Sequence, residues 1–201
     1  MSESVHPRKG WFMLRDRKAT RVTAVALLLS AVSASPSLAS GSKNQELADA
    51  GKIVAVALPI AAGSISMYKD DWVGVVQLIA VTGLTGATAF GLKQVVRERR
   101  PDGSDWKSFP SDQSALGFAP AAYLWDRYGW EYGLPAYAAA GFVGYARVAS
   151  DRHHWWDVAA SAGIAWLYSR LLTSEYHPPQ NFYTGAYVTP HSAYVTVNYR
   201  F

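Results

Sequence analysis

Charged and imidazole side chains at three places in this 201-residue sequence have the chemistry to transfer a phosphoryl group. Lys93 and Arg100 form the first place, and their spacing of seven residues is about two helical turns, which predicts that both project from one helix face. Arg147, His153 and Asp157 form the third place. A phosphoryl group spreads negative charge over its oxygens, so its transfer needs fixed cations and a nucleophile in line with the leaving group. These residues predict cationic phosphate holders around a nucleophilic histidine.

The histidine of the third place has a suitable orienting partner. His153 and Asp157 lie four residues apart, so at the start of a helix they share a face. The carboxylate can then hold one ring nitrogen and leave the other free to attack phosphorus. His154 is an alternative nucleophile, but its i+4 position is Val158 and Asp157 is at i+3, so it has the poorer orienting partner. Arg147 adds a guanidinium that can clamp an anion with two parallel hydrogen bonds.

The middle place is the Pro-Ser-Asp-Gln segment at residues 110–113. The hydroxyl of Ser111 and nearby backbone amides can bind phosphate oxygens, and Ser114 can cap the helix that follows. Asp112 adds a negative charge where an anion would sit, which opposes binding unless the carboxyl is protonated or paired with a lysine or arginine. Gln113 can hydrogen-bond but cannot protonate a leaving group.

The order and spacing of these residues resemble the phosphatidic acid phosphatase type 2 (PAP2) family, part of the acid phosphatase and haloperoxidase superfamily. The resemblance covers roughly residues 72–172. It implies that His153 attacks phosphorus, that Asp157 fixes its tautomer, and that neither a metal nor another cofactor is needed. It also implies that the phosphate is bound by six residues: Lys93, Arg100, Ser111, Asp112, Gln113 and Arg147.

The middle segment departs from the family pattern Pro-Ser-Gly-His, because Asp112 replaces the glycine and Gln113 replaces the histidine that protonates the departing alkoxide. Ala146, where the family often has serine, is a milder departure. Loss of a general acid lowers a rate by about 10² to 10⁴, and by less when the leaving group needs no proton. Turnover is therefore expected to favour diphosphates or aryl phosphates over alkyl monoesters, or else Asp112 replaces the missing acid.

The leading interpretation is a metal-independent PAP2-type phosphatase, which hydrolyses lipid phosphates or diphosphates, or related phosphomonoesters, through a phosphohistidine intermediate. An alternative is a catalytically impaired PAP2-like protein that binds phosphate-bearing lipids. A third is a vanadate-dependent haloperoxidase with His153 as the vanadate ligand, for which the chain is short. The expected partners are a phosphorylated lipid or small phosphoester substrate and a membrane.

Composition excludes several classes of protein. The absence of cysteine rules out disulfides, thiolate catalysis and cysteine-ligated zinc. The excess of lysine and arginine lies within residues 1–39, so the remainder is formally neutral and offers no basic surface for nucleic acid. Half of all residues are hydrophobic and only 17% are charged, which favours a helical protein that is partly buried in a membrane.

Three regions are predicted along the chain. Residues 1–39 are expected to be a signal peptide or an N-terminal membrane segment, because basic residues precede the uncharged run 22–34 and small residues follow it. A PAP2-like helical domain is expected over residues 40–176, and a C-terminal tail over 177–201. An export signal places the protein in a bacterial-type cell envelope.

Apolar helical stretches dominate the middle region, so the predicted fold class is all-α, a helical bundle of the PAP2 or acid phosphatase type with a short C-terminal β-hairpin. Five stretches are expected: 46–67, 72–92, 114–125, 132–146 and 155–172. Only 72–92 reaches full membrane-spanning length, and the helix it begins is expected to end at Pro101.

Short apolar helices fit either a soluble bundle or the tilted spans of a small integral enzyme. If they are spans, an even number of crossings separates the three places, which then lie on one side of the membrane. The exported start makes that side the periplasm, so the expected location is the inner membrane with the site facing the periplasm. A soluble periplasmic or an outer-membrane-associated protein is the alternative.

The tail alternates aromatic and β-branched residues with polar ones, which predicts a β-hairpin with arms at 182–188 and 193–201. A final strand that ends in Phe201 resembles the sorting signal of outer-membrane barrels. The alternative, favoured here, is an edge hairpin packed on the helices, because alternation is typical of half-buried strands.

Overall fold

The computed structural model describes residues 43–178, 182–189 and 192–199, so the predicted leader at residues 1–39 lies outside the described residues. Within residues 43–178 the all-α fold class is confirmed. Five helices form the bundle: α2 (Lys43–Tyr68), α3 (Trp72–Val95), α4 (Asp112–Tyr128), α5 (Trp130–Ala149) and α6 (Trp155–Leu172). Each of the five predicted apolar stretches lies inside one of these helices.

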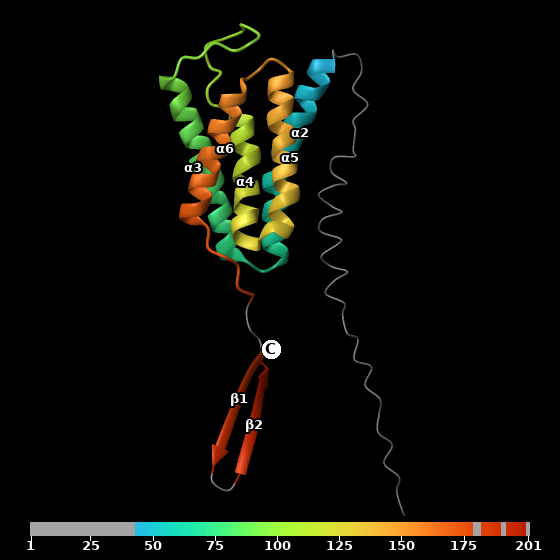
Figure 1. Cartoon of the computed structure of the whole chain (residues 1–201), viewed down its shortest axis with the longest axis vertical. Helices are drawn as coiled ribbons and strands as arrows, with labels where there is room; N and C mark the ends of the chain where they lie inside the picture. Colours follow the sequence, from blue (N-terminus) through green and yellow to red (C-terminus); the bar gives the residue numbers. More distant parts are fainter. Residues whose placement is uncertain (1–42, 179–181, 190–191, 200–201) are drawn as a thin grey trace, which may run out of the picture.

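Helix α4 is the centre of the bundle, and it contacts each of the other four helices (Figure 1). Its neighbours come close because its buried face is built largely from small residues, including Ala115, Gly117, Ala119, Ala121 and Ala122. The ends of α5 and α6 that lie near the candidate site also meet closely. A Cβ atom added to Gly144 would lie 2.6 Å from Cγ1 of Val158, so glycine is needed for this approach.

Among the described residues, two helices are long and apolar enough to cross a membrane, α2 with 26 residues and α3 with 24. The prediction that the stretch 72–92 alone reaches spanning length was therefore wrong, because α2 is also long and apolar enough although charged residues lie in its first turns. The outer face of α3 exposes large hydrophobic side chains to the surroundings: Val73, Val76, Ile79, Leu84 and Phe90. An apolar face of this size is typical of a surface that contacts lipid or another protein.

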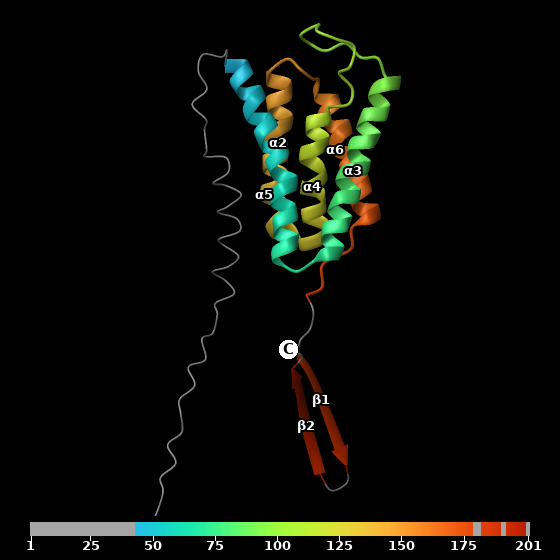
Figure 2. The same ribbon diagram turned by 180° about the vertical axis from the view of Figure 1, so that it is seen from behind.

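The helices run alongside one another, so their termini gather at two ends of the bundle (Figures 1 and 2). We call one the site end: it contains the last turns of α3 and α5, the first turns of α4 and α6, and the connecting segments 96–111 and 150–154. Helix α2 also begins at the site end. The opposite end contains the turn between α2 and α3, the junction at Gly129 and the end of α6. Gly129 has φ +85°, a conformation that favours glycine.

The tail contains strands β1 (Phe182–Thr189) and β2 (Ser192–Tyr199), which pair antiparallel with Phe182 opposite Tyr199. Only the backbone of these strands is described. The sorting signal and the packing of the hairpin on the helices therefore both remain predictions.

Candidate active site

Lys93 lies in the last turn of α3, and its side chain is buried. Its Nζ donates a hydrogen bond of 2.6 Å to Oδ2 of Asp112, the first residue of α4, whose own side chain is 57% exposed. The sequence predicts that Asp112 is tolerated beside a bound anion if its carboxyl is protonated or paired with a lysine or arginine, and the structure shows the pairing with a lysine. The Asp112 carboxylate thus accepts the hydrogen bond that Lys93 would otherwise donate to a phosphate oxygen.

Arg100 reaches the site end from a loop. The prediction that Lys93 and Arg100 share one helix face was wrong, because α3 ends at Val95, six residues before Pro101, and the backbone at Val96 is extended. The seven-residue spacing therefore does not set their geometry.

The loop 96–111 folds back through hydrogen bonds of its own. Arg100 Nε donates to Oδ1 of Asp105 at 2.8 Å, and the Arg100 backbone N–H donates to the Asp105 carbonyl at 3.0 Å. The backbone N–H of Asp102 donates to the carbonyl of Asp151, in the segment between α5 and α6. These contacts, and not a helix, bring the guanidinium of Arg100 toward the third place.

Arg147 lies in the last turn of α5 and is only 6% exposed. Its Nε is buried and has no hydrogen-bond partner among the described residues. Its carbonyl accepts the backbone N–H groups of both Arg152 and His153, so the chain wraps tightly after the helix. That turn returns His153 to the arginine that precedes it by six positions.

His153 and Asp157 meet as their spacing predicts. Nδ1 of His153 lies 3.3 Å from Oδ2 of Asp157, and both side chains are buried. The same oxygen accepts the hydroxyl of Ser108 at 2.5 Å and the backbone N–H of His154 at 2.9 Å. Three donors on one oxygen favour the ionised carboxylate. We therefore assign the ring proton to Nδ1, which leaves the lone pair of Nε2 free.

Burial lowers the pKa of His153 below its ordinary value. The hydrogen bond to Asp157 raises this pKa, but the positive charges of Arg147, Lys93 and Arg100 lower it further. The imidazole is therefore neutral at neutral pH, which is the nucleophilic form. Arg147, Lys93 and Arg100 are three of the six predicted phosphate holders, and their charges all act on the ring of His153. The first and third places therefore lie together at the site end.

The middle place lies at the start of α4. Ser111 is the N-cap residue, and its Oγ accepts both the backbone N–H of Ser114 at 3.3 Å and the Ser114 hydroxyl at 2.9 Å. The prediction that Ser114 caps this helix was wrong, because the helix begins two residues before it. Gln113 has a buried Oε1 with no partner among the described residues. The free N–H groups of the first helical turn favour an anion here.

Sequence reasoning missed Ser108, which supports Asp157 from the loop, and Glu98, whose carbonyl accepts the backbone N–H of Ser108. Ser108 contributes its hydroxyl, and the Glu98 carboxylate accepts the indole N–H of Trp156 at 2.6 Å. The partners of Ser108 and Glu98 lie 49 and 58 positions away, so no spacing rule points to them. A weak signal was available, because both residues are polar: Glu98 lies between the two residues of the first place, and Ser108 lies just before the middle place.

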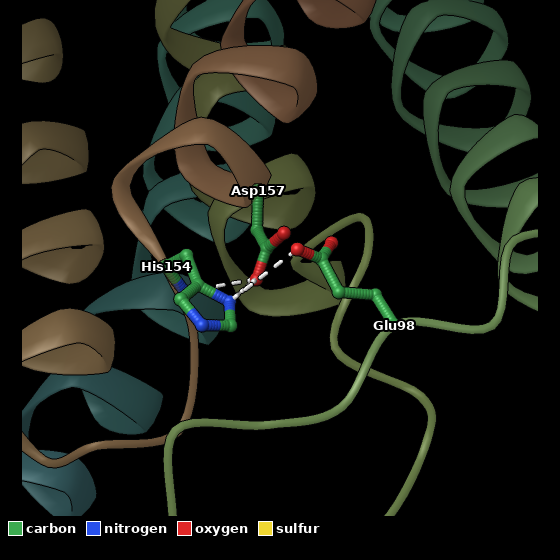
Figure 3. A group of neighbouring side chains, drawn as sticks. All are labelled: Glu98, His154 and Asp157. Atoms are coloured by element: carbon green, nitrogen blue, oxygen red, sulfur yellow. Dashed lines mark hydrogen bonds and ion pairs between the residues drawn. The ribbon is translucent and has the colours of Figure 1, made fainter.

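Glu98, His154 and Asp157 bring ligand atoms within 4.8 Å of one another (Figure 3). Two carboxylates and an imidazole can hold a divalent cation. Here Nδ1 of His154 lies 3.7 Å from Oε1 of Glu98 and 3.6 Å from Oδ2 of Asp157. The ring of His154 also stacks on Trp156 with centroids 4.3 Å apart. These groups surround the carboxylate that orients His153.

Comparison with known proteins identifies the family of the chain. The PAP2 superfamily model matches residues 74–178. The lipid A 4'-phosphatase of Helicobacter pylori is 31% identical over 132 residues, which cover 60% of this chain and 67% of that protein. The lipid A 1-phosphatase of Porphyromonas gingivalis is 36% identical over 76 residues, which cover 36% of this chain and 17% of that protein. No solved structure matches the chain.

The relatives support a phosphatase that acts on a phosphorylated lipid. The family match spans the helices that carry Lys93, Arg147 and Asp157 together with the loops between them. By this match over more than half of its length, the chain belongs to the PAP2 superfamily.

Proposed function

We propose that this protein hydrolyses lipid phosphates or diphosphates, or related phosphomonoesters, in the cell envelope through a phosphohistidine intermediate. One observation carries the proposal: a buried imidazole, held by Asp157 at 3.3 Å, has its pKa lowered by burial and by three surrounding cations. Neutral imidazole, fixed tautomer and positive surroundings are what attack on a phosphoryl group requires.

In the first step, Nε2 of His153 attacks phosphorus, the N–P bond forms, and the bond to the leaving oxygen breaks with its electron pair on that oxygen. The cations hold the remaining phosphoryl oxygens, and the unpaired Nε of Arg147 supports its assignment to this role. Asp157 stabilises the ring as it becomes cationic. In the second step, water attacks phosphorus, the N–P bond breaks, and inorganic phosphate leaves.

The leaving group decides which substrates react. Gln113 can only hydrogen-bond to the departing oxygen, so a leaving phosphate or aryl oxide is favoured over an alkoxide that needs a proton. Asp112 is the alternative acid, because its side chain is exposed at the start of α4. To act as the acid it must carry a proton, so it would have to give up its role as the carboxylate partner of Lys93. If Asp112 is the acid, Asp112→Asn lowers kcat for alkyl esters. If its carboxylate instead competes with the substrate phosphate for Lys93, the same substitution lowers KM.

The relatives support a phosphorylated lipid of the lipid A type as the substrate, because one of them is a lipid A 4'-phosphatase and the other a lipid A 1-phosphatase. The two long apolar helices and the exposed hydrophobic face of α3 support a membrane location. We propose the inner membrane, with the site end facing the periplasm.

Substitution of His153 by alanine tests the nucleophile. We expect phosphate release from purified protein to fall by about 10⁴-fold or more, as for other removed nucleophiles. His154→Ala is the matched control, because it removes the neighbouring imidazole. The His154→Ala variant should still form an acid-labile phosphoenzyme, whereas the His153→Ala variant should form none. A useful substrate panel is lipid A, phosphatidic acid, phosphatidylglycerol phosphate and undecaprenyl diphosphate. If His153→Ala turns over normally, His153 is not the nucleophile.

A second candidate function is a catalytically impaired protein that binds phosphate-bearing lipids. Two observations favour it: Asp112 already occupies Lys93, and Gln113 stands where the family has its acid. In that case wild-type protein binds phosphorylated lipids but releases no phosphate from any member of the panel. Substitution of Arg147 would then weaken lipid binding without a catalytic effect to measure.

A further inference from the structure

A cavity of about 700 Å³ opens beside the candidate active site at the end of α3. It shares one residue, Lys93, with the phosphate holders described above. The remaining lining comes from the end of α3 and from the loop that follows: Gln94, Arg97, Ser104, Asp105, Trp106 and Lys107.

The cavity carries positive charge that no neighbouring residue neutralises. Arg97 and Lys107 are exposed, and neither forms an ion pair among the described residues. Asp105 is the only acid in the lining, but its carboxylate already accepts Arg100 Nε and the backbone N–H of Lys107. Lys93 is bound to Asp112. Two uncommitted cations therefore line a space that Lys93 also borders.

Backbone contacts hold these cations in place across the loop. A parallel bridge pairs Glu98 with Lys107, and the backbone N–H of Ser108 donates to the Glu98 carbonyl at 3.0 Å. This pairing places Lys107 beside Glu98, the residue that follows Arg97. Trp106 precedes it and is 62% exposed, so its ring is available as a flat apolar surface.

We propose that this cavity binds a second phosphate group of the substrate, with Arg97 and Lys107 as its ligands and Trp106 as a platform for a sugar ring between the two phosphates. A cavity of this size holds a group far larger than one phosphate. Arginine and lysine both bind phosphate with charge-assisted hydrogen bonds. The inference rests on the proposed function, because Lys93 joins this cavity to the proposed reaction centre.

The test compares matched glycolipids with one and with two phosphates, in micelles of a neutral detergent. Binding is measured with the His153→Ala variant, so that turnover does not interfere, and hydrolysis is measured with the otherwise native protein. Arg97→Ala and Lys107→Ala should each weaken binding of the two-phosphate lipid about tenfold and leave the one-phosphate lipid unchanged. Trp106→Ala should weaken both glycolipids, and Trp106→Phe should restore part of the loss.

Arg99→Ala is the matched control, because it removes the same charge two positions away from Arg97, outside the cavity lining. The second phosphate could be on the far side of a sugar ring or directly attached to the first phosphate, and a lipid diphosphate separates these two sources. If Arg97→Ala and Lys107→Ala weaken binding of the lipid diphosphate alone, the cavity binds the directly attached phosphoryl group, and the role of Trp106 as a sugar platform is overturned. Equal losses on all lipids overturn the proposal altogether. If anionic vesicles then lose binding and zwitterionic vesicles do not, the cations contact the membrane surface.

Failure of the proposed function gives a different pattern. Wild-type protein would then release no phosphate from any lipid, while the preference of the His153→Ala variant for two phosphates would still be measurable. Equal binding of one-phosphate and two-phosphate lipids overturns the second phosphate site whether or not turnover is seen.

Discussion

The two ends of the bundle each bury an arginine to the same extent, 6% exposed, but treat it in opposite ways. At the opposite end, Arg127 donates from Nε to Oδ2 of Asp71 at 2.8 Å and from one terminal nitrogen to Oδ1 at 2.6 Å. Its other terminal nitrogen donates to the carbonyl and hydroxyl of Ser174, and Tyr128 adds its hydroxyl to the same carboxylate. At this end, which we call the closed end, the guanidinium of Arg127 and the carboxylate of Asp71 both have hydrogen-bond partners within the protein.

Three of the five buried polar atoms without partners among the described residues lie at the site end: Arg147 Nε, Gln113 Oε1 and Asp157 Oδ1. The other two are the hydroxyls of Thr82 and Thr85, inside α3. An unsatisfied buried polar atom costs free energy of about 1 to 3 kcal/mol, and native proteins contain few of them. Their concentration at one end teaches that polar groups there are arranged for a ligand, whereas those at the other end fasten helices together. The proposed substrate would supply the missing partners.

Of the changes that test this contrast between the two ends, the largest effect is expected from Gln113→His, which gives the site the family's acid. Hydrolysis of phosphatidic acid should rise by about 10² to 10⁴, because its alkoxide leaves only with a proton. Hydrolysis of a diphosphate lipid should change much less. The measurement is the ratio of kcat/KM for the two substrates before and after the change. An unchanged ratio contradicts the leaving-group explanation.

Arg127→Met should break the closed end. It leaves Asp71 buried without its cation, which typically costs about 3 to 5 kcal/mol. The measurement is the free energy of unfolding in denaturant, with the protein in detergent. The double variant Asp71→Asn with Arg127→Met should recover part of the loss, because no buried charge remains. Stability equal to wild type would show that this ion pair does not hold the bundle.

Arg147→Lys sharpens the comparison from the other side. Lysine keeps the charge but cannot clamp an anion with two hydrogen bonds, so kcat/KM should fall by about 10² to 10³, as when one transition-state donor is lost. The free energy of unfolding should change little, because Arg147 Nε has no partner to lose. Arg152→Lys, at the same end, is the matched control and should retain near-normal turnover.

The smallest effect is a shift in pH dependence on Lys93→Gln. The pKa of His153 is lowered first by burial and also by Lys93, so removal of that charge raises it toward the ordinary value of 6.5. Only the neutral ring attacks, so kcat/KM should begin to fall at a higher pH in the variant than in wild type as the solution is acidified. A pH profile checks this, with Arg170→Gln on α6 as a control. If kcat/KM of the Lys93→Gln variant and of wild type fall at the same pH on acidification, the charge of Lys93 does not act on the ring of His153.

Sequence patterns predicted the helices well, because apolar runs bounded by charged residues, glycine and proline mark them locally. The i+4 relation of His153 and Asp157 likewise needed only four residues of chain, and it survives as a contact of 3.3 Å. The prediction for Arg100 was wrong because the spacing rule assumed that α3 continues to this residue, whereas Arg100 lies in a loop and is bound to Asp105.

Contacts between distant segments could not be read from the sequence. Ser108 contacts the carboxylate of Asp157 across 49 positions. For Asp112, pairing with Lys93 was one of the expected alternatives, but the sequence could not choose among protonation, Lys93 and an arginine. Both contacts depend on which helix ends the packing of α4 brings together. The choice between Ser111 and Ser114 as cap depended on where the helix begins, and both serines are good caps, so composition alone did not distinguish them.

An odd number of helices separates the start of α2 from the end of α6, so the chain leaves the bundle at the end away from the reacting phosphate (Figure 2). If all five helices cross a bilayer and phosphate is cleaved in the periplasm, every residue after Leu172 emerges in the cytoplasm. Delivery of the tail to the outer membrane and a periplasmic reaction centre then exclude each other. A reporter enzyme fused after Phe201 would decide between them by the compartment in which it becomes active.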